Sequence, residues 1–135
     1  MTQLSQTNPS SPGSILSISY DDSLLRTREW ILKAEGYHVT SALGLSEAFE
    51  YCHKGSYDLA IIGHSIPKQH KLALIHEIRK YCPARVLSIV RHGEHSLPEA
   101  DAWVDSSDGP DALVRIVKEI LPPPTAQGRA SSRER

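Results

Sequence analysis

The chain has 135 residues, of which 39% are hydrophobic and 23% are charged. This length predicts one globular domain with a single core. Fifteen Lys and Arg against sixteen Asp and Glu give a net charge of -1, so no overall positive field favours nucleic acid or an anionic membrane. No apolar stretch exceeds the four residues of Leu59–Ile62, whereas a span of a bilayer needs ~20. Because the first dozen residues also lack Lys, Arg and an apolar core, we expect a cytoplasmic protein with no nucleic-acid or membrane partner.

Composition divides the chain into three segments. Residues 1–13 and 122–135 are rich in Ser, Thr, Gln, Pro, Gly and Arg and contain almost nothing to bury, which predicts disordered tails. The segment between them, residues 14–121, is the predicted domain.

Within that domain, short apolar runs alternate with segments of helical spacing. The runs predict buried strands at Ser14–Ser19, His38–Ser41, Asp58–Gly63, Arg85–Val90 and Ala102–Val104. The helical segments end at Gly36, Gly55, Pro83 and Pro122, residue types that commonly follow helices. This alternation predicts a doubly wound α/β fold with a five-stranded parallel sheet.

The connection before the last strand is irregular. Residues 91–101 are too few for an ordinary helical crossover, and Pro98 interrupts them. We therefore expect a shortened or missing fourth helix at this step.

Six local motifs occur in the order and spacing of the receiver domain of bacterial response regulators. They are Ile15-Leu-Ser-Ile, Glu35-Gly-Tyr-His-Val, Glu47-Ala-Phe-Glu, Asp58-Leu-Ala-Ile-Ile, Ile66-Pro67 and Ala100-Asp-Ala-Trp. Together they make residues 14–121 resemble this family, whose flavodoxin-like, CheY-like fold has the strand order 2-1-3-4-5. The resemblance implies a role in two-component, phosphorelay signal transduction.

The same resemblance implies a phosphorylation pocket whose chemical residues this chain has replaced. In the family, two acidic residues after the first strand hold Mg²⁺, and an Asp at the end of the third strand accepts the phosphoryl group. A hydroxyl and a Lys at the ends of the last two strands grip its oxygens. The matching positions in this chain are Ser19, Tyr20, Gly63, Val90 and Ser106. Asp21 is the acid that directly follows Ser19 and Tyr20. The chain thus resembles a degenerate receiver, or pseudo-receiver, that lacks the phospho-acceptor Asp and has no catalytic residue or cofactor. One hypothesis is that the ring of Tyr20 covers the abandoned pocket.

These departures favour a stand-alone, phosphorylation-independent module that binds a protein, with no enzymatic activity. The partner would be a histidine kinase, an effector or a second copy of the chain. Trp30 and Trp103 are the candidate contact residues; the sequence leaves open whether Trp30 is exposed or in the core.

An alternative hypothesis makes the domain a metal or ligand sensor. His64 follows the third predicted strand, and His92 and His95 follow the fourth. The carboxyl ends of parallel strands meet at one sheet edge, where α/β proteins bind ligands, and a set of imidazoles suits zinc. No other pattern predicts a metal.

Overall fold

The computed structural model describes residues 13–123. Five strands form one parallel sheet in the order β2-β1-β3-β4-β5. Their bounds are Ser14–Ser19 for β1, His38–Leu43 for β2, Leu59–Ile62 for β3, Arg85–Val90 for β4 and Ala102–Asp105 for β5. The predicted fold class and strand order are therefore confirmed. Nearly all of both predicted tails lies outside the described residues, so tail disorder stays a prediction.

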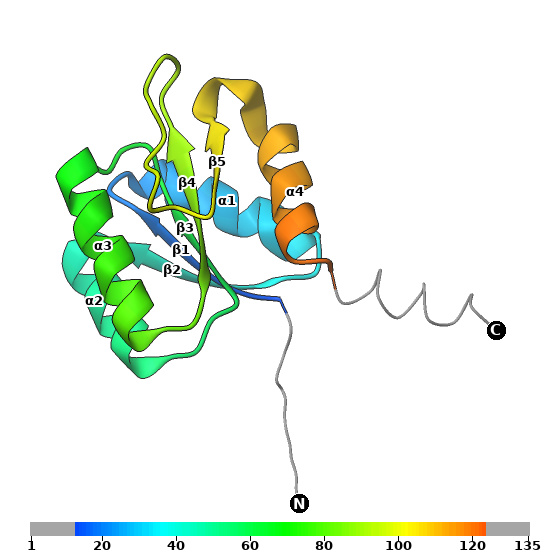
Figure 1. Ribbon diagram of the computed structural model, residues 1–135. Coiled ribbons are helices and arrows are strands. Elements are labelled where there is room, and N and C mark those ends of the chain that lie inside the picture. The colour runs from blue at the N-terminus through cyan, green and yellow to red at the C-terminus, as the bar shows by residue number, and fades with distance from the viewer. Residues whose placement is uncertain (1–12, 124–135) are drawn as a thin grey trace, which may run out of the picture.

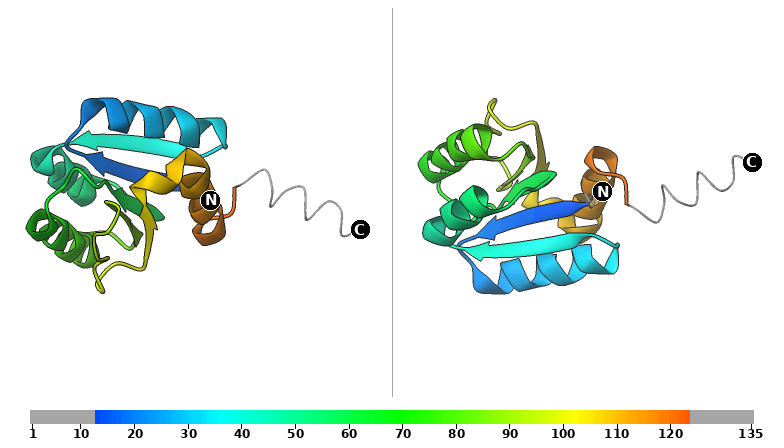
Figure 2. Two further views of the ribbon diagram at one scale, coloured as in Figure 1. Left: turned by 90° about the horizontal axis from the view of Figure 1, so that it is seen from above. Right: turned by 90° about the horizontal axis from the view of Figure 1, so that it is seen from below.

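Four helices cover the sheet on both faces (Figures 1 and 2). They are α1 (Asp22–Ala34), α2 (Leu45–Lys54), α3 (Lys68–Tyr81) and α4 (Gly109–Ile120), the last preceded by a 3₁₀ turn at Ser106–Asp108. Helices α1 and α4 pack on one face, and α2 and α3 on the other. Among residues 13–123, no helix is long and apolar enough to cross a membrane.

Each face of the sheet has its own apolar core. The α2/α3 face buries Leu16, Ile18, Ile62 and Val86, among others, and the α1/α4 face buries Ile15, Ile61, Leu87 and Ile89. Successive strand residues point to opposite faces, which explains why the central strands are apolar throughout. The third strand is one residue shorter at each end than predicted. Asp58 instead accepts hydrogen bonds from the backbone N–H groups of Gly13 and Ser14, each at 3.0 Å.

The helix expected to be short or missing between β4 and β5 is indeed replaced by turns. Asp101 fixes the end of this connection, because its carboxylate accepts the Val86 backbone N–H at 2.7 Å and pairs with Arg79 at 3.1 Å. The Arg79 side chain also donates to the Glu99 carbonyl at 2.9 Å. Side chains thus hold this loop against β4 and α3.

Candidate functional site

The carboxyl edge of the sheet gathers the residues that the sequence singled out. Ser19 ends β1, Gly63 follows β3, Val90 ends β4 and Ser106 follows β5. The Gly63 N–H donates to the Ile18 carbonyl at 3.0 Å, which continues the β1–β3 pairing. The sequence therefore predicted correctly which strand ends form this edge. The side chain next to Gly63 was not among those that the sequence analysis named.

The guanidinium of Arg28, from α1, occupies the space beside Gly63. A β-carbon built on Gly63 would lie 2.7 Å from Nη1 of Arg28 and 3.1 Å from the Ile18 carbonyl oxygen. Both distances are closer than ordinary van der Waals contact. Glycine at this position is what allows the guanidinium to approach the end of β3.

Arg28 is a buried cation, with 7% of its surface exposed. Within residues 13–123, its Nη1 has no hydrogen-bond partner and its guanidinium joins no ion pair. Burial lowers the pKa of Arg28, while the negative charge of Asp21 opposes that shift. An arginine keeps its proton even when its pKa falls in this way, so the site contains a buried positive charge that the nearby Asp21 offsets without forming an ion pair.

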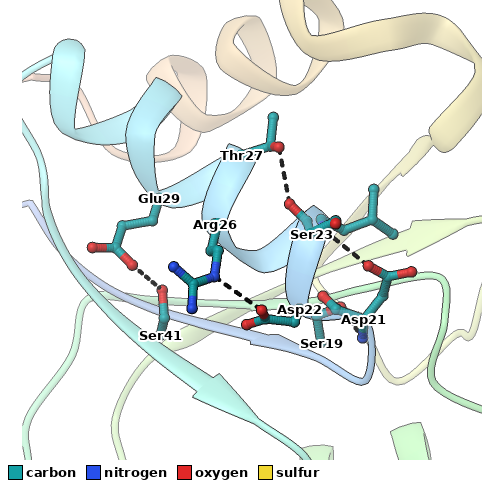
Figure 3. A network of polar contacts seen from close by, with 9 residues as sticks. Ser19, Asp21, Asp22, Ser23, Arg26, Thr27, Glu29 and Ser41 are labelled. Carbon is teal, nitrogen blue, oxygen red and sulfur yellow. Dashed lines mark hydrogen bonds and ion pairs between the residues drawn. The ribbon is translucent and has the colours of Figure 1, made fainter.

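Asp21 is the nearby acid, and it is already engaged as the N-cap of α1 (Figure 3). Its carboxylate accepts the Leu24 N–H at 3.1 Å, which satisfies one of the free donors at the helix start. Asp22 pairs with Arg26 on the exposed side of the same turn at 2.9 Å. The two acids that follow β1 thus serve α1, and neither forms an ion pair with Arg28.

Lys71 is a second buried cation, on the opposite face of the sheet. It is 4% exposed, and its Nζ donates to the Ile89 carbonyl at 2.7 Å and to Ser88 Oγ at 3.0 Å. Burial is the main cause of its lowered pKa. Burial also lowers the pKa of His64, and the positive charges of Arg28, Arg91 and Lys71 lower it further. The edge therefore contains two buried cations, Arg28 and Lys71, near the acids Asp21 and Glu94.

Arg28 and Lys71 were missed by the sequence analysis, although their spacing carried a signal. Arg28 lies three and four residues from Leu25, Leu24, Ile31 and Leu32, and Lys71 lies three and four residues before Leu74 and Ile75. Such positions share one face of a helix. A charged residue in the middle of an apolar helical face is the pattern that could have found both.

Arg28, and not Tyr20, is the side chain next to Gly63. That the ring of Tyr20 covers the pocket stays a prediction. The Tyr20 hydroxyl is 2.8 Å from Nδ1 of His70 at the start of α3, and the ring is only half-buried. The Tyr20 backbone N–H donates to Ser65 Oγ at 3.0 Å, and Ser65 Oγ also lies 3.2 Å from Ser19 Oγ. Tyr20 and Ser19 therefore tie β1 to the loop after β3.

The three candidate metal ligands do not converge. His92 is exposed and contacts Asp105 at 3.3 Å, whereas Nδ1 of His64 is buried and has no hydrogen-bond partner among the described residues. In residues 13–123, no group of three His, Cys, Asp or Glu side chains could hold a metal ion. His64, His92 and His95 thus do not form the zinc site that the alternative hypothesis required.

Both tryptophans are on the surface, but on different elements. Trp30 on α1 is 78% exposed, which answers the question that the sequence left open, and Trp103 on β5 is 53% exposed. Trp103 pairs in register with Ser88 of β4, on the side of the edge strand where residues 91–101 form turns instead of a helix. Each tryptophan is available for contact.

Comparison with solved structures places the fold. TrrA, a response regulator of Thermotoga maritima, was solved in complex with Mg²⁺-BeF; it is 28% identical, covers 80% of this chain and 98% of its own, and has a TM-score of 0.68. A second structure contains histidine kinase ThkA in complex with TrrA, at 27% identity with a TM-score of 0.68, over 80% of this chain and 97% of that one. A putative response regulator from Chloroflexus aurantiacus is 25% identical over 82% of this chain and 98% of its own, with a TM-score of 0.70. Neither a family model nor a curated protein matches the sequence.

The fold is therefore that of a response regulator receiver domain, and the structures it resembles belong to two-component signalling proteins. The chain spans nearly the whole length of these receiver structures.

Proposed function

We propose that this chain is a degenerate receiver domain of two-component signalling that binds a protein partner without being phosphorylated. The observation that carries the proposal is Arg28 beside Gly63. The position that matches the phosphoryl acceptor has no side chain, and a guanidinium fills the space next to it. A cation at this point repels Mg²⁺, which receiver chemistry needs to neutralise the transferring group.

The remaining positions of the pocket support the same proposal. Ser19 and Tyr20 replace the metal-binding acids, and the Asp21 carboxylate caps α1. Val90 has no hydroxyl with which to follow a phosphoryl group, and Ser106 has no charge. A receiver fold that lacks this chemistry can still bind another molecule, and binding is therefore the function that we propose.

A protein partner is supported by the likeness to TrrA, whose complex with histidine kinase ThkA has been solved. Trp30 projects from α1 and Trp103 from β5, and both are large, exposed apolar side chains. Tryptophan is enriched among the residues that dominate binding energy at interfaces. We infer that one of these two surfaces contacts a histidine kinase, an effector or a second copy of the chain.

The test measures phosphoryl-group chemistry and binding separately. The full chain is incubated with acetyl phosphate and Mg²⁺ and its mass is measured; no phosphoryl adduct is expected. Its affinity for purified histidine kinases of the same cell, and for itself, is then measured with and without Mg²⁺ and beryllofluoride. The chain is expected to bind at least one kinase or a second copy of itself. The phosphoryl mimic is expected to leave that affinity unchanged. A stable adduct, or an affinity that depends on the mimic, would overturn the proposal.

A further inference from the structure

The strand β2 has an unpaired outer edge. It lies at one border of the sheet (Figure 2), and among residues 13–123 it pairs with β1 alone. The His38 N–H donates to the Gly13 carbonyl at 2.9 Å, and the Gly44 N–H donates to the Ser19 carbonyl at 3.0 Å. Successive residues of a strand point their backbone groups to opposite sides. The residues of β2 with even numbers therefore face β1, and those with odd numbers face outward.

The outward backbone groups belong to Val39, Ser41 and Leu43. The Leu43 N–H donates to the Glu47 carboxylate at 2.8 Å, whereas within residues 13–123 no strand pairs with the groups of Val39 and Ser41. Lys, Asp, Glu and Pro, which commonly protect an edge strand, are absent from His38–Leu43. An edge of this kind is a template on which another strand can pair.

A second copy of the chain presents a complementary edge. When Thr40 of both copies lies on a two-fold axis, antiparallel pairing sets Val39 opposite Ser41 of the other copy, and the reverse. Opposite residues whose groups face each other exchange two hydrogen bonds. This register therefore forms four hydrogen bonds and leaves the contact between Leu43 and Glu47 intact. The same patch serves both copies, as a two-fold interface requires.

The charges on α1 match this register. Ser41 Oγ donates to the Glu29 carboxylate at 2.9 Å (Figure 3), so Glu29 lies on the side of α1 next to β2. Lys33 follows one turn later on the same side and pairs with Glu29 at 2.7 Å. Because α1 runs against β2, Lys33 lies toward the start of that strand. The two-fold axis brings Ser41 and Glu29 of one copy opposite the start of the other β2, and hence toward its Lys33.

We propose that two copies of the chain pair through the outer edges of β2 and form one continuous sheet. This contact goes beyond the function proposed above and does not rest on it. Trp103 is on β5, at the opposite border of the sheet, and Trp30 lies about 100° around α1 from Glu29. A chain paired through β2 therefore keeps both tryptophans exposed for another partner.

Hydrogen exchange of the full chain tests the pairing at single amides. Sedimentation between about 1 µM and about 1 mM, which covers weak protein affinities, is expected to show a dimer that grows with concentration. In the dimer, exchange of the Val39 and Ser41 amides is expected to slow at least about tenfold. The Thr40 and Ala42 amides already face β1, so their exchange should change much less.

Two substitutions at one position separate the backbone from the side chain. Ser41→Pro removes the outward N–H without removing a bond to β1, and proline is tolerated on edge strands. It is expected to weaken dimerisation at least about tenfold. Ser41→Ala is the matched control, because it loses the hydroxyl contact with Glu29 but keeps the N–H. It should dimerise about as well as wild type.

Charge reversal tests the register. Lys33→Glu places acids of the two copies opposite each other and is expected to weaken the dimer, whereas Glu29→Lys added to it restores opposite charges and should restore the dimer. Arg115→Glu makes the same change of charge at an exposed position of α4, away from β2, and should have no effect.

Four results would overturn the proposal. The first is a chain that stays monomeric at about 1 mM. The second is a dimer in which the Val39 and Ser41 amides exchange at the rate of the monomer, as self-association through a tryptophan would produce. The third is an equal loss of dimer in Ser41→Ala and Ser41→Pro, and the fourth is an equal loss in Lys33→Glu and Arg115→Glu. The amide spectrum of each variant reports its folding, and the exchange rates of wild type decide the question even where a variant does not fold.

Discussion

Nη1 of Arg28 lies where a β-carbon on Gly63 would be only 2.7 Å away. The two residues come from different elements, α1 and the end of β3. The missing side chain of Gly63 leaves the space that the Arg28 guanidinium occupies. A larger residue at position 63 would push the guanidinium aside, and a smaller, neutral residue at position 28 would leave a void beside the glycine. At the carboxyl edge of this receiver fold, a buried cation thus lies next to the position that matches the phosphoryl acceptor.

An acid at position 63 should be tolerated better than its neutral isostere, and it should not restore phosphorylation. In Gly63→Asp, the new carboxylate meets the unpartnered guanidinium of Arg28, whereas Gly63→Asn has the same shape without the charge. We expect Gly63→Asp to be about 1–3 kcal/mol more stable than Gly63→Asn, because a buried charge gains its counterion. Urea unfolding of the two variants at pH 7 measures the difference.

Acetyl phosphate with Mg²⁺ provides the second measurement on the same Gly63→Asp variant. No phosphoryl adduct is expected, because the introduced carboxylate is paired with Arg28 and the acids that would hold the metal are absent at Ser19 and Tyr20. Equal stability of Gly63→Asp and Gly63→Asn, or phosphorylation of Gly63→Asp, would contradict the placement of a buried, positively charged Arg28 beside position 63.

The buried Lys71 should make stability depend on pH. Burial lowers its pKa in the folded state, below the value of about 10.4 of an unfolded chain. Between these two values the unfolded chain binds more protons, so the free energy of unfolding rises with pH. Lys71→Met should remove this rise, which urea unfolding between pH 7 and pH 10 would measure.

Lys68→Met is the control for that experiment, since Lys68 is exposed in the first turn of the same helix. It should keep the slope of wild type. If Lys71→Met and wild type have parallel pH profiles, the Lys71 ammonium is not held in a desolvated site.

Asp101 should account for part of the stability of the loop before β5. Burial opposes ionisation of this carboxyl, but hydrogen bonds from Arg79 and from the Val86 N–H outweigh it and lower the pKa of Asp101. This contribution is present above the ordinary Asp pKa near 4 and is lost as the pH falls through the lower folded value. We expect Asp101→Asn to cost about 1 kcal/mol at pH 7.

Acid titration of unfolding tests the sign of that prediction. The difference between Asp101→Asn and wild type should shrink steadily below pH 4. Asp22→Asn, which breaks an exposed pair with Arg26, should cost less at pH 7, because surface ion pairs contribute little. A constant difference at all pH values would mean that the charge of Asp101 is not what holds the loop.

The elements were predictable because apolar spacing determines them, whereas the site depends on which way single side chains turn. Ser14–Ser19 and Arg85–Val90 match their predicted bounds, since buried parallel strands are apolar throughout. Predicting the side chain next to Gly63 would have required knowing that Arg28 is buried, although arginine is most often exposed. The Tyr20 hydroxyl contacts His70 of α3, a partner fifty residues away that no spacing along the chain reveals.

The two tryptophans should respond separately to a partner, because they lie on different elements and both are exposed. Trp30→Phe and Trp103→Phe each leave one reporter, and each should change the free energy of unfolding by no more than about 0.5 kcal/mol, as expected for surface positions. Acrylamide should quench the remaining tryptophan in both free variants. When a kinase or a second copy binds, quenching should fall for one tryptophan and stay constant for the other, which identifies the face in contact. A partner that binds and protects neither tryptophan would exclude both as contact residues, and a strongly blue-shifted emission in a free variant would show that its tryptophan is buried.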